Sequence, residues 1–208
     1  MPDALGQALR AVARKSGWAV KRDMLSRAEG GVNLAVHPIR GEYGRIGFFA
    51  KPELWDRTLW SILQIVGNEA QPTSFRFTGW FICSVPPLVA EGLDPAARPE
   101  DHAAQMLALA RRCLAERALW DGYDLDAAIA GETPSRAYSY HITRVVARIC
   151  AGDRDGARAI CTAARAGTLD VRRWMESADE QGWTGAVAPG LVRFVDFFEL
   201  APLWMQRN

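Results

Sequence analysis

The spacing of apolar residues changes near residue 94. Before this point, short runs of alternating apolar and polar residues are separated by glycine-bearing turns; from Pro99 onward, apolar residues recur every three or four positions. Strands followed by helices favour an α+β fold. We therefore expect an antiparallel sheet with helices in residues 1–94, and a helical region in residues 95–208 packed on it. A single domain that contains both parts is the alternative.

The first part is expected to open with a helix over residues 3–16 that stops at Gly17. A second amphipathic helix should run from Pro52 to Gly67, with Trp55, Leu59, Ile62, Leu63 and Val66 on its buried stripe. The expected sheet has four strands: Trp18–Ser26, Val32–Pro38, Arg45–Lys51 and Phe75–Ser84. The last of them is apolar on both faces in its second half, which is typical of an interior strand.

The second part is expected to be helical throughout. Gly, Asp and Pro residues at the breaks in the pattern divide it into helices over 99–120, from Asp124 to Ala130, over 135–151, from Asp153 to Gly167, and around Trp174 and Met175. An aromatic tail with Phe194, Phe197, Phe198 and Trp204 follows. We expect this tail to dock on the body, because it is too apolar to remain in water.

Two segments resemble known families. Residues 147–157, Ala-Arg-Ile-Cys-Ala-Gly-Asp-Arg-Asp-Gly-Ala, are similar to the turn of a tetratricopeptide unit, which implies one helical hairpin near 135–166. The opening helix before Gly17-Trp18, the Lys51-Pro52 start of the helix with Trp60, and Ser74–Phe81 resemble an uncharacterised bacterial family of helix-plus-antiparallel-sheet domains. That resemblance spans about residues 3–90, supports the fold and implies no activity.

Charge and composition exclude several classes of partner. The chain has 25 basic and 24 acidic residues, so it lacks the surplus of positive charge that phosphate backbones attract, and we do not expect nucleic acid. The sequence has neither a secretory signal pattern nor an apolar run long enough for a membrane span, and its four cysteines are far apart. A cytoplasmic protein with buried, reduced thiols is the expectation.

The sequence contains no motif that assigns chemistry. Its three histidines, His37, His102 and His141, lie on different predicted elements, so we expect no metal site. The glycines of Gly41–Gly47 lead into a strand, which favours a hairpin turn over a phosphate-binding loop. We accordingly expect no cofactor and assign no catalytic residue.

One group of residues suggests a binding site. Arg45 and Arg76 stand on otherwise apolar predicted strands, and His37 and Tyr43 lie on or beside the same meander. Together they would form a cationic, aromatic-edged groove on one sheet face, where an arginine can hold a carboxylate or phosphate. The alternative is that each arginine reaches solvent or pairs with a nearby acid.

These features favour a non-catalytic protein-binding or regulatory module, of an accessory or toxin-neutralising type, whose partner is another protein. The alternative is a small enzyme, or a binder of anions or small molecules, with its site at the seam between the sheet and the helical half. No feature of the sequence selects an oligomeric state.

Overall fold

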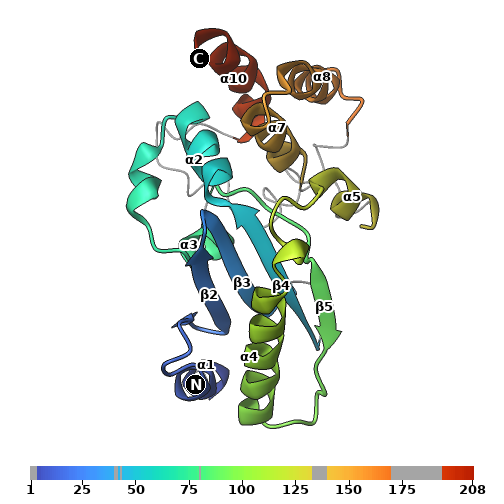
Figure 1. Ribbon diagram of the computed structural model, residues 1–208. Coiled ribbons are helices and arrows are strands. Elements are labelled where there is room, and N and C mark those ends of the chain that lie inside the picture. The colour runs from blue at the N-terminus through green and yellow to red at the C-terminus, as the bar shows by residue number, and fades with distance from the viewer. Residues whose placement is uncertain (1–3, 40–41, 43, 80, 133–139, 170–193) are drawn as a thin grey trace. The chain divides into compact units, whose positions relative to one another are not determined.

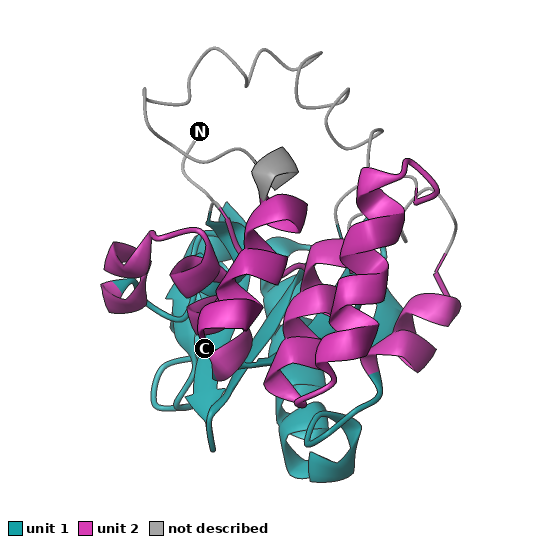
Figure 2. Ribbon diagram, turned by 90° about the horizontal axis from the view of Figure 1, so that it is seen from above, with its two compact units in different colours: residues 1–53, 71–80, 85–124 teal, residues 54–70, 81–84, 125–208 magenta. Residues whose placement is uncertain are grey.

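The computed structural model describes residues 4–39, 42, 44–79, 81–132, 140–169 and 194–208 (Figure 1). The chain divides into two compact units (Figure 2). Unit 1 comprises residues 1–53, 71–80 and 85–124, and unit 2 comprises residues 54–70, 81–84 and 125–208. Both units contain segments from before and after residue 94. The two units therefore do not coincide with the two parts, residues 1–94 and 95–208, that the hydrophobic pattern predicted.

Unit 1 is built on a five-stranded antiparallel sheet with the strand order β1-β2-β3-β4-β5. The strands are β1 (Ala19–Lys21), β2 (Met24–Glu29), β3 (Val32–Pro38), β4 (Arg45–Pro52) and β5 (Val89–Gly92). Strands β2 and β3 are joined by Gly30-Gly31, whose φ angles of 56° and 81° match the two-residue turn that suits a twisted hairpin. The α+β fold class is confirmed, with five strands in place of four.

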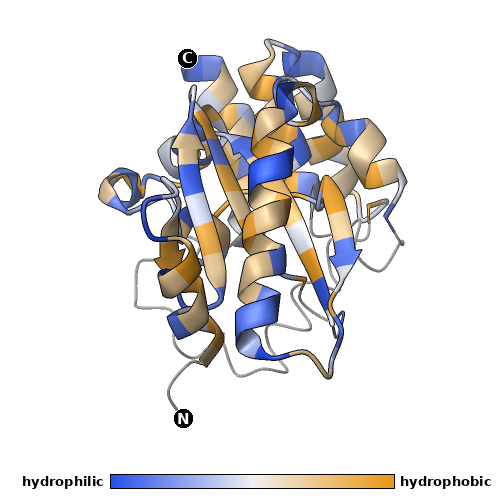
Figure 3. Cartoon of the chain, turned by 60° about the horizontal axis from the view of Figure 1, so that its bottom comes forward, coloured by the Kyte–Doolittle hydropathy of each residue, from blue (hydrophilic) through white to orange (hydrophobic). Residues whose placement is uncertain are grey.

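One face of the sheet is apolar and is covered by α1 (Ala4–Val12) and α4 (Pro99–Ala115). Helix α4 begins with proline at its first position and acids in its first turn, both of which favour a helix start. Figure 3 shows hydrophilic residues on the outer side of α4. The core between these layers contains Leu9, Leu25, Leu34, Val36, Ile46, Phe48, Ala50, Met106, Leu109, Ala110 and Cys113.

The predicted strand Phe75–Ser84 is wrong. Phe75–Thr78 forms a one-turn helix, α3, in which the Phe75 N–H donates to the Pro72 carbonyl at 2.8 Å. Residues 81–88, all of them described, form no regular element. The missing strand is β5, which pairs with β4. The predicted strand Trp18–Ser26 is a hairpin, because the chain turns at Arg22-Asp23.

Unit 2 is helical in its described residues. Its elements are α2 (Glu53–Ile62, whose first residue belongs to unit 1), η1 (Val66–Ala70), α5 (Leu125–Ala130), α7 (His141–Cys150), α8 (Arg154–Arg165) and α10 (Phe194–Arg207). A short helix η2 (Arg117–Leu119) follows α4 in unit 1. The helices predicted to end at Ala130, residue 151 and Gly167 are confirmed, while Trp174, Met175 and Tyr138 lie outside the described residues.

Helix α2 is tied to other segments of unit 2 by its polar side chains. The Trp60 indole donates to the Phe81 carbonyl at 2.6 Å, and Asp56 accepts from the Cys83 N–H at 2.8 Å. The Trp204 indole of α10 donates to Ser61 Oγ at 3.1 Å, so the aromatic tail docks as predicted. Val66 departs from the predicted stripe: it is 59% exposed, because α2 ends at Ile62.

We predict that Phe48→Ala lowers the free energy of unfolding by about 3–5 kcal/mol, because it leaves a cavity under α4 where Phe48 is fully buried. Urea denaturation measures the change. The exposed Arg111→Ala on α4 serves as the control and should change stability by less than about 0.5 kcal/mol. A loss below about 1 kcal/mol for Phe48→Ala would contradict this packing.

Candidate functional site

The two arginines of the predicted groove lie at different ends of β4. Arg45 begins the strand, is exposed and forms an ion pair with Glu42. Arg76 lies in α3 and is buried, with a guanidinium nitrogen 3.6 Å from Glu53 Oε1. Its carbonyl accepts a hydrogen bond from Lys51 Nζ, near the far end of β4. The structure therefore does not bring Arg45 and Arg76 together.

His37 and Arg45 do share one face of the sheet, because His37 pairs with Gly47 in the β3–β4 register. The His37 ring stacks on Phe49 with a centroid distance of 4.1 Å, and its Nδ1 lies 2.8 Å from the Pro38 carbonyl. Tyr43 lies outside the described residues. Of the predicted group, the described residues show only that His37 and Arg45 share a face of the sheet.

The α7–α8 hairpin is the best-defined polar structure in unit 2. The chain leaves α7 through Gly152, whose φ of 81° favours glycine. Asp153 then caps α8, because its Oδ1 accepts from the Gly156 N–H at 2.9 Å. A Cβ atom at Gly156 would lie too close to the Asp153 carboxylate and the Arg148 guanidinium as they stand, so a larger residue there would require these side chains to move. The capping role predicted for Asp153 is confirmed.

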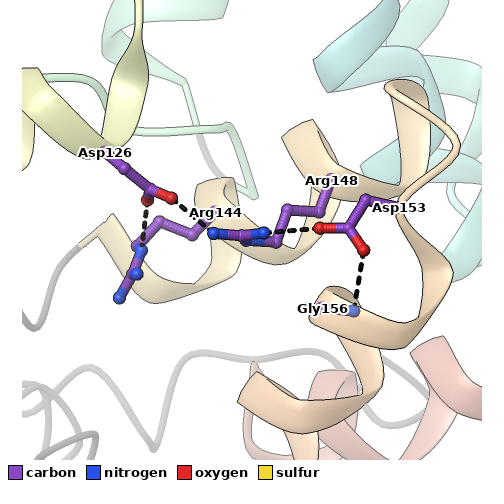
Figure 4. A network of polar contacts seen from close by, with 5 residues as sticks. All are labelled: Asp126, Arg144, Arg148, Asp153 and Gly156. Carbon is purple, nitrogen blue, oxygen red and sulfur yellow. Dashed lines mark hydrogen bonds and ion pairs between the residues drawn. The ribbon is translucent and has the colours of Figure 1, made fainter.

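A chain of ion pairs connects this hairpin to α5 (Figure 4). Asp126 on α5 accepts from Arg144 Nε at 2.7 Å and from Arg148 Nη2 at 2.5 Å. Arg148 Nη1 also donates to Asp153 Oδ2 at 2.5 Å. The two arginines and two aspartates balance in charge, and their side chains are 26–44% exposed. The network therefore fixes the geometry of α5, α7 and the start of α8 more than it contributes stability.

The same contacts shift the ionisation of the acids. The Gly156 N–H and then Arg148 hold the pKa of Asp153 below its ordinary value. Burial alone would raise the pKa of Asp126, but hydrogen bonds and charges from Arg144 and Arg148 outweigh it, so this pKa is also lowered. Both carboxylates are consequently charged at neutral pH.

Helix α10 packs against α8, and a groove opens beside their contact. The buried side chains of α8 are small and those of α10 are larger: Ala157, Cys161 and Ala164 on α8, and Phe197, Phe198, Ala201 and Met205 on α10. The groove has a volume of about 470 Å³. We call it the α8–α10 groove; it is lined by Arg158, Thr162, Arg165, Glu199, Pro202, Leu203 and Gln206.

The two walls of the groove differ in chemistry. On α8, Arg158 and Arg165 are seven residues apart and lie on the same side of the helix. Arg158 pairs with Asp155 at 3.0 Å, whereas Arg165 has no ion pair within the part of the chain that the structure describes. On α10, the Leu203 side chain is 48% exposed. The α8 side of the groove therefore carries two arginines, and the α10 side carries Pro202 and Leu203 together with the polar Glu199 and Gln206.

Pro202 leaves one backbone carbonyl of α10 without its usual helical donor. Proline has no N–H, so the Phe198 carbonyl lacks the donor that residue 202 would supply in a regular helix. The end of α10 is held in place by Arg154, whose Nη1 donates to the Met205 carbonyl at 3.2 Å. Sequence reasoning missed this groove; its visible signal was the helical spacing of Arg154, Arg158 and Arg165.

Other reactive groups show no assembled site among the residues that the structure describes. No three His, Cys, Asp or Glu side chains gather there as metal ligands would. Cys83, Cys113 and Cys161 are buried and Cys150 is half-buried, and all four are free thiols. Burial raises the pKa of Cys113 and of Cys161 to about 11.

Comparison with family models, curated proteins and solved structures gave no match to this chain. The helices that the structure describes are all too short or too polar to cross a membrane. The fold class and the geometry of the two units are therefore the basis for any functional proposal.

We predict that Asp126→Asn destabilises the protein by about 1 kcal/mol or less at pH 7, and that the difference disappears in acid. The folded-state pKa of Asp126 is lowered. Its stabilisation is therefore present above the unfolded value of about 3.9 and is lost as the pH falls through the folded pKa. Thermal denaturation from pH 7 to pH 3 tests this, with exposed Asp23→Asn as the control. A difference that persists unchanged at pH 3 would refute the assignment.

We predict that the thiols react slowly in the native protein. With pKa values of about 11 for Cys113 and Cys161, fewer than about one in a thousand of these groups is a thiolate at pH 7.5. A thiol-exchange reagent should label all four cysteines rapidly in urea and label these two far more slowly without it. Labelling of Cys113 or Cys161 within seconds in the native state would be the contrary result.

Proposed function

We propose that the protein is a non-catalytic protein-binding module of a regulatory or accessory type. Its α8–α10 groove would hold a segment of the partner that carries acidic side chains beside an apolar one. The single observation that supports this is that one groove is lined both by arginines of α8 and by the exposed Leu203 of α10. Covering the apolar surface of Leu203 with a partner would be favourable, by about 25 cal/mol for each Å² of apolar area removed from water.

Charge complementarity selects the kind of segment. The groove lining contains Arg158 and Arg165 against one acid, Glu199, and Arg165 is the cation with no described ion pair. An acidic side chain of the partner would pair with Arg165, while an apolar side chain would cover Leu203. Exposed ion pairs contribute little affinity, about 0–1 kcal/mol, so the apolar contact should set affinity and the arginines should set specificity and association rate.

The test is a display screen of random 12-residue peptides on the whole chain, followed by affinity measurement on the enriched peptides by fluorescence polarisation. We expect enrichment of Asp or Glu next to Leu, Ile or Phe. Leu203→Asp should raise Kd about tenfold or more, equivalent to about 1.4 kcal/mol, and Arg165→Glu should raise it about twofold to fivefold, as expected for one exposed ion pair. Affinity for the wild type should also fall as salt increases.

Matched controls exist on the same chain. Val66→Asp is the control for Leu203→Asp, because Val66 is 59% exposed, and Arg111→Glu is the control for Arg165→Glu, because Arg111 is an exposed arginine of α4. Neither Val66 nor Arg111 lines the groove. Both controls should bind like the wild type. If the enriched peptides bind Leu203→Asp and Arg165→Glu as tightly as they bind the wild type, the groove is not the binding site and the proposal is refuted.

A further inference from the structure

A second hollow lies within unit 1, at the edge of the sheet. It has a volume of about 580 Å³ and is formed where β1 stops beside β2 and the segment before α3 passes. Its lining is small and rich in hydroxyl groups: Gly17, Ala19, Ser26, Arg27, Ala28, Pro72, Thr73 and Ser74. Because most of these side chains are short, the backbone of β2 is accessible from the hollow.

The second half of β2, after Ser26, has no neighbouring strand on this side. The β1–β2 register ends at Ala19 opposite Ser26, whereas β2 continues to Glu29. Glu29 and Val32 are the hydrogen-bonded pair that closes the turn between β2 and β3. Because hydrogen bonding alternates along an antiparallel strand, the backbone groups of Arg27 and Glu29 point to β3, and those of Ala28 point away from β3. Ala28 is exposed, and none of the described residues pairs with its backbone. It thus offers one donor and one acceptor at an open strand edge.

Two buried polar atoms lie on the same face as Ala28. Ser26 Oγ belongs to a side chain that is 1% exposed, and Asn33 Nδ2 to one that is 2% exposed; neither atom has a hydrogen-bond partner among the described residues. Ser26 lines the hollow, and Asn33 is opposite Ala28 in the β2–β3 register. Buried polar atoms are nearly always hydrogen-bonded, so these two atoms, one of them on a residue that lines the hollow, are candidates for a partner outside the described residues.

The charged member of the lining does not point to an anion. Arg27 donates from Nε and Nη2 to Glu29 Oε2, at 2.9 Å and 2.6 Å, so its charge is already matched. What remains in the hollow is neutral: a backbone N–H and C=O, hydroxyl groups and small apolar surfaces. Such a site fits the backbone of an extended peptide better than it fits a phosphate or a free carboxylate.

We propose that unit 1 binds an extended peptide segment by strand addition at Ala28, with a hydroxyl- or amide-bearing side chain of the peptide placed over Ser26. One peptide residue would exchange two backbone hydrogen bonds with Ala28. Its side chain would fall on the face that carries Ser26 and Asn33. This site shares no residue with the α8–α10 groove, so the two proposals can fail separately.

The experiment uses two blocked tripeptides, acetyl-Val-Ser-Val-methylamide and acetyl-Val-Ala-Val-methylamide, titrated into the whole isotope-labelled protein by NMR. We expect the Ala28 amide proton to shift downfield, because it gains a hydrogen bond. The serine peptide should bind about threefold to tenfold more tightly than the alanine peptide, the gain of one hydrogen bond. Sodium phosphate or acetate at matched ionic strength should not produce the Ala28 shift.

Three variants separate the contributions. Ala28→Pro removes the outward N–H and leaves the bonds to β3 intact, so it should abolish binding of both peptides, while Ala28→Ser keeps the N–H and should retain it. Ser26→Ala should make the two peptides bind equally. Thermal denaturation checks that each variant is folded. If Ala28→Pro does not fold, two results still test whether the peptide binds at Ala28: the Ala28 amide shift in the wild type, and the relative affinity of the two peptides for Ser26→Ala.

Three outcomes would overturn the proposal. One is an Ala28 amide that does not respond to either peptide while the protein is folded. Another is an unchanged preference for the serine peptide in Ser26→Ala, which would place the side chain elsewhere. Phosphate or acetate shifting the Ala28 amide as strongly as the peptides would likewise refute it, because the site would then be an anion site.

Discussion

The burial of both faces of the central strands is the constraint on which unit 1 depends. Residues Val32–Val36 of β3 and Ile46–Lys51 of β4 are buried throughout, so both faces need cover. The apolar face is covered by α1 and α4, whereas the other face carries Lys51, which is fully buried. A buried ammonium group requires compensation, and within unit 1 the Arg76 carbonyl and the Phe77 ring, 5.1 Å away, provide it. This requirement holds residues 72–79 against the sheet, beside the edge where Ala28 is open.

The packing of α8 against α10 in unit 2 depends on the different sizes of their buried side chains. Short side chains on α8 let α10 pack closely with its larger ones, and the Asp153 cap and the Asp126–Arg148 pairs fix where α8 begins. The outward stripes of both helices then remain on either side of one groove. Its shape is therefore a consequence of the packing, while its arginines and Leu203 are not required by that packing and are free to serve recognition.

The sequence predicted the parts of the fold that rest on local patterns. Periodicity located strand β3, helix α8 and the start of α4, which ends at Ala115 and not at residue 120, and capping chemistry placed Asp153 at the start of α8. The prediction from periodicity failed at Phe75–Thr78. The Phe-Arg-Phe alternation there fits a strand, but the segment forms a helical turn whose side chains contact Lys51 and Glu53 of unit 1. Strand β5 was missed because it is four residues long and follows two prolines. Neither proposed binding site could be predicted, because each joins segments far apart in the sequence: α8 with α10, and β2 with residues 72–74.

The measurement that tests the central claim most directly is hydrogen–deuterium exchange of the whole chain with and without a bound partner or a selected peptide. The account predicts slower exchange in α8 and in the described part of α10, centred on Arg158–Arg165 and on residues 199–206, with the sheet core β3–β4 unchanged. Slower exchange confined to other elements, with α8 and α10 unaffected by saturating ligand, would contradict it.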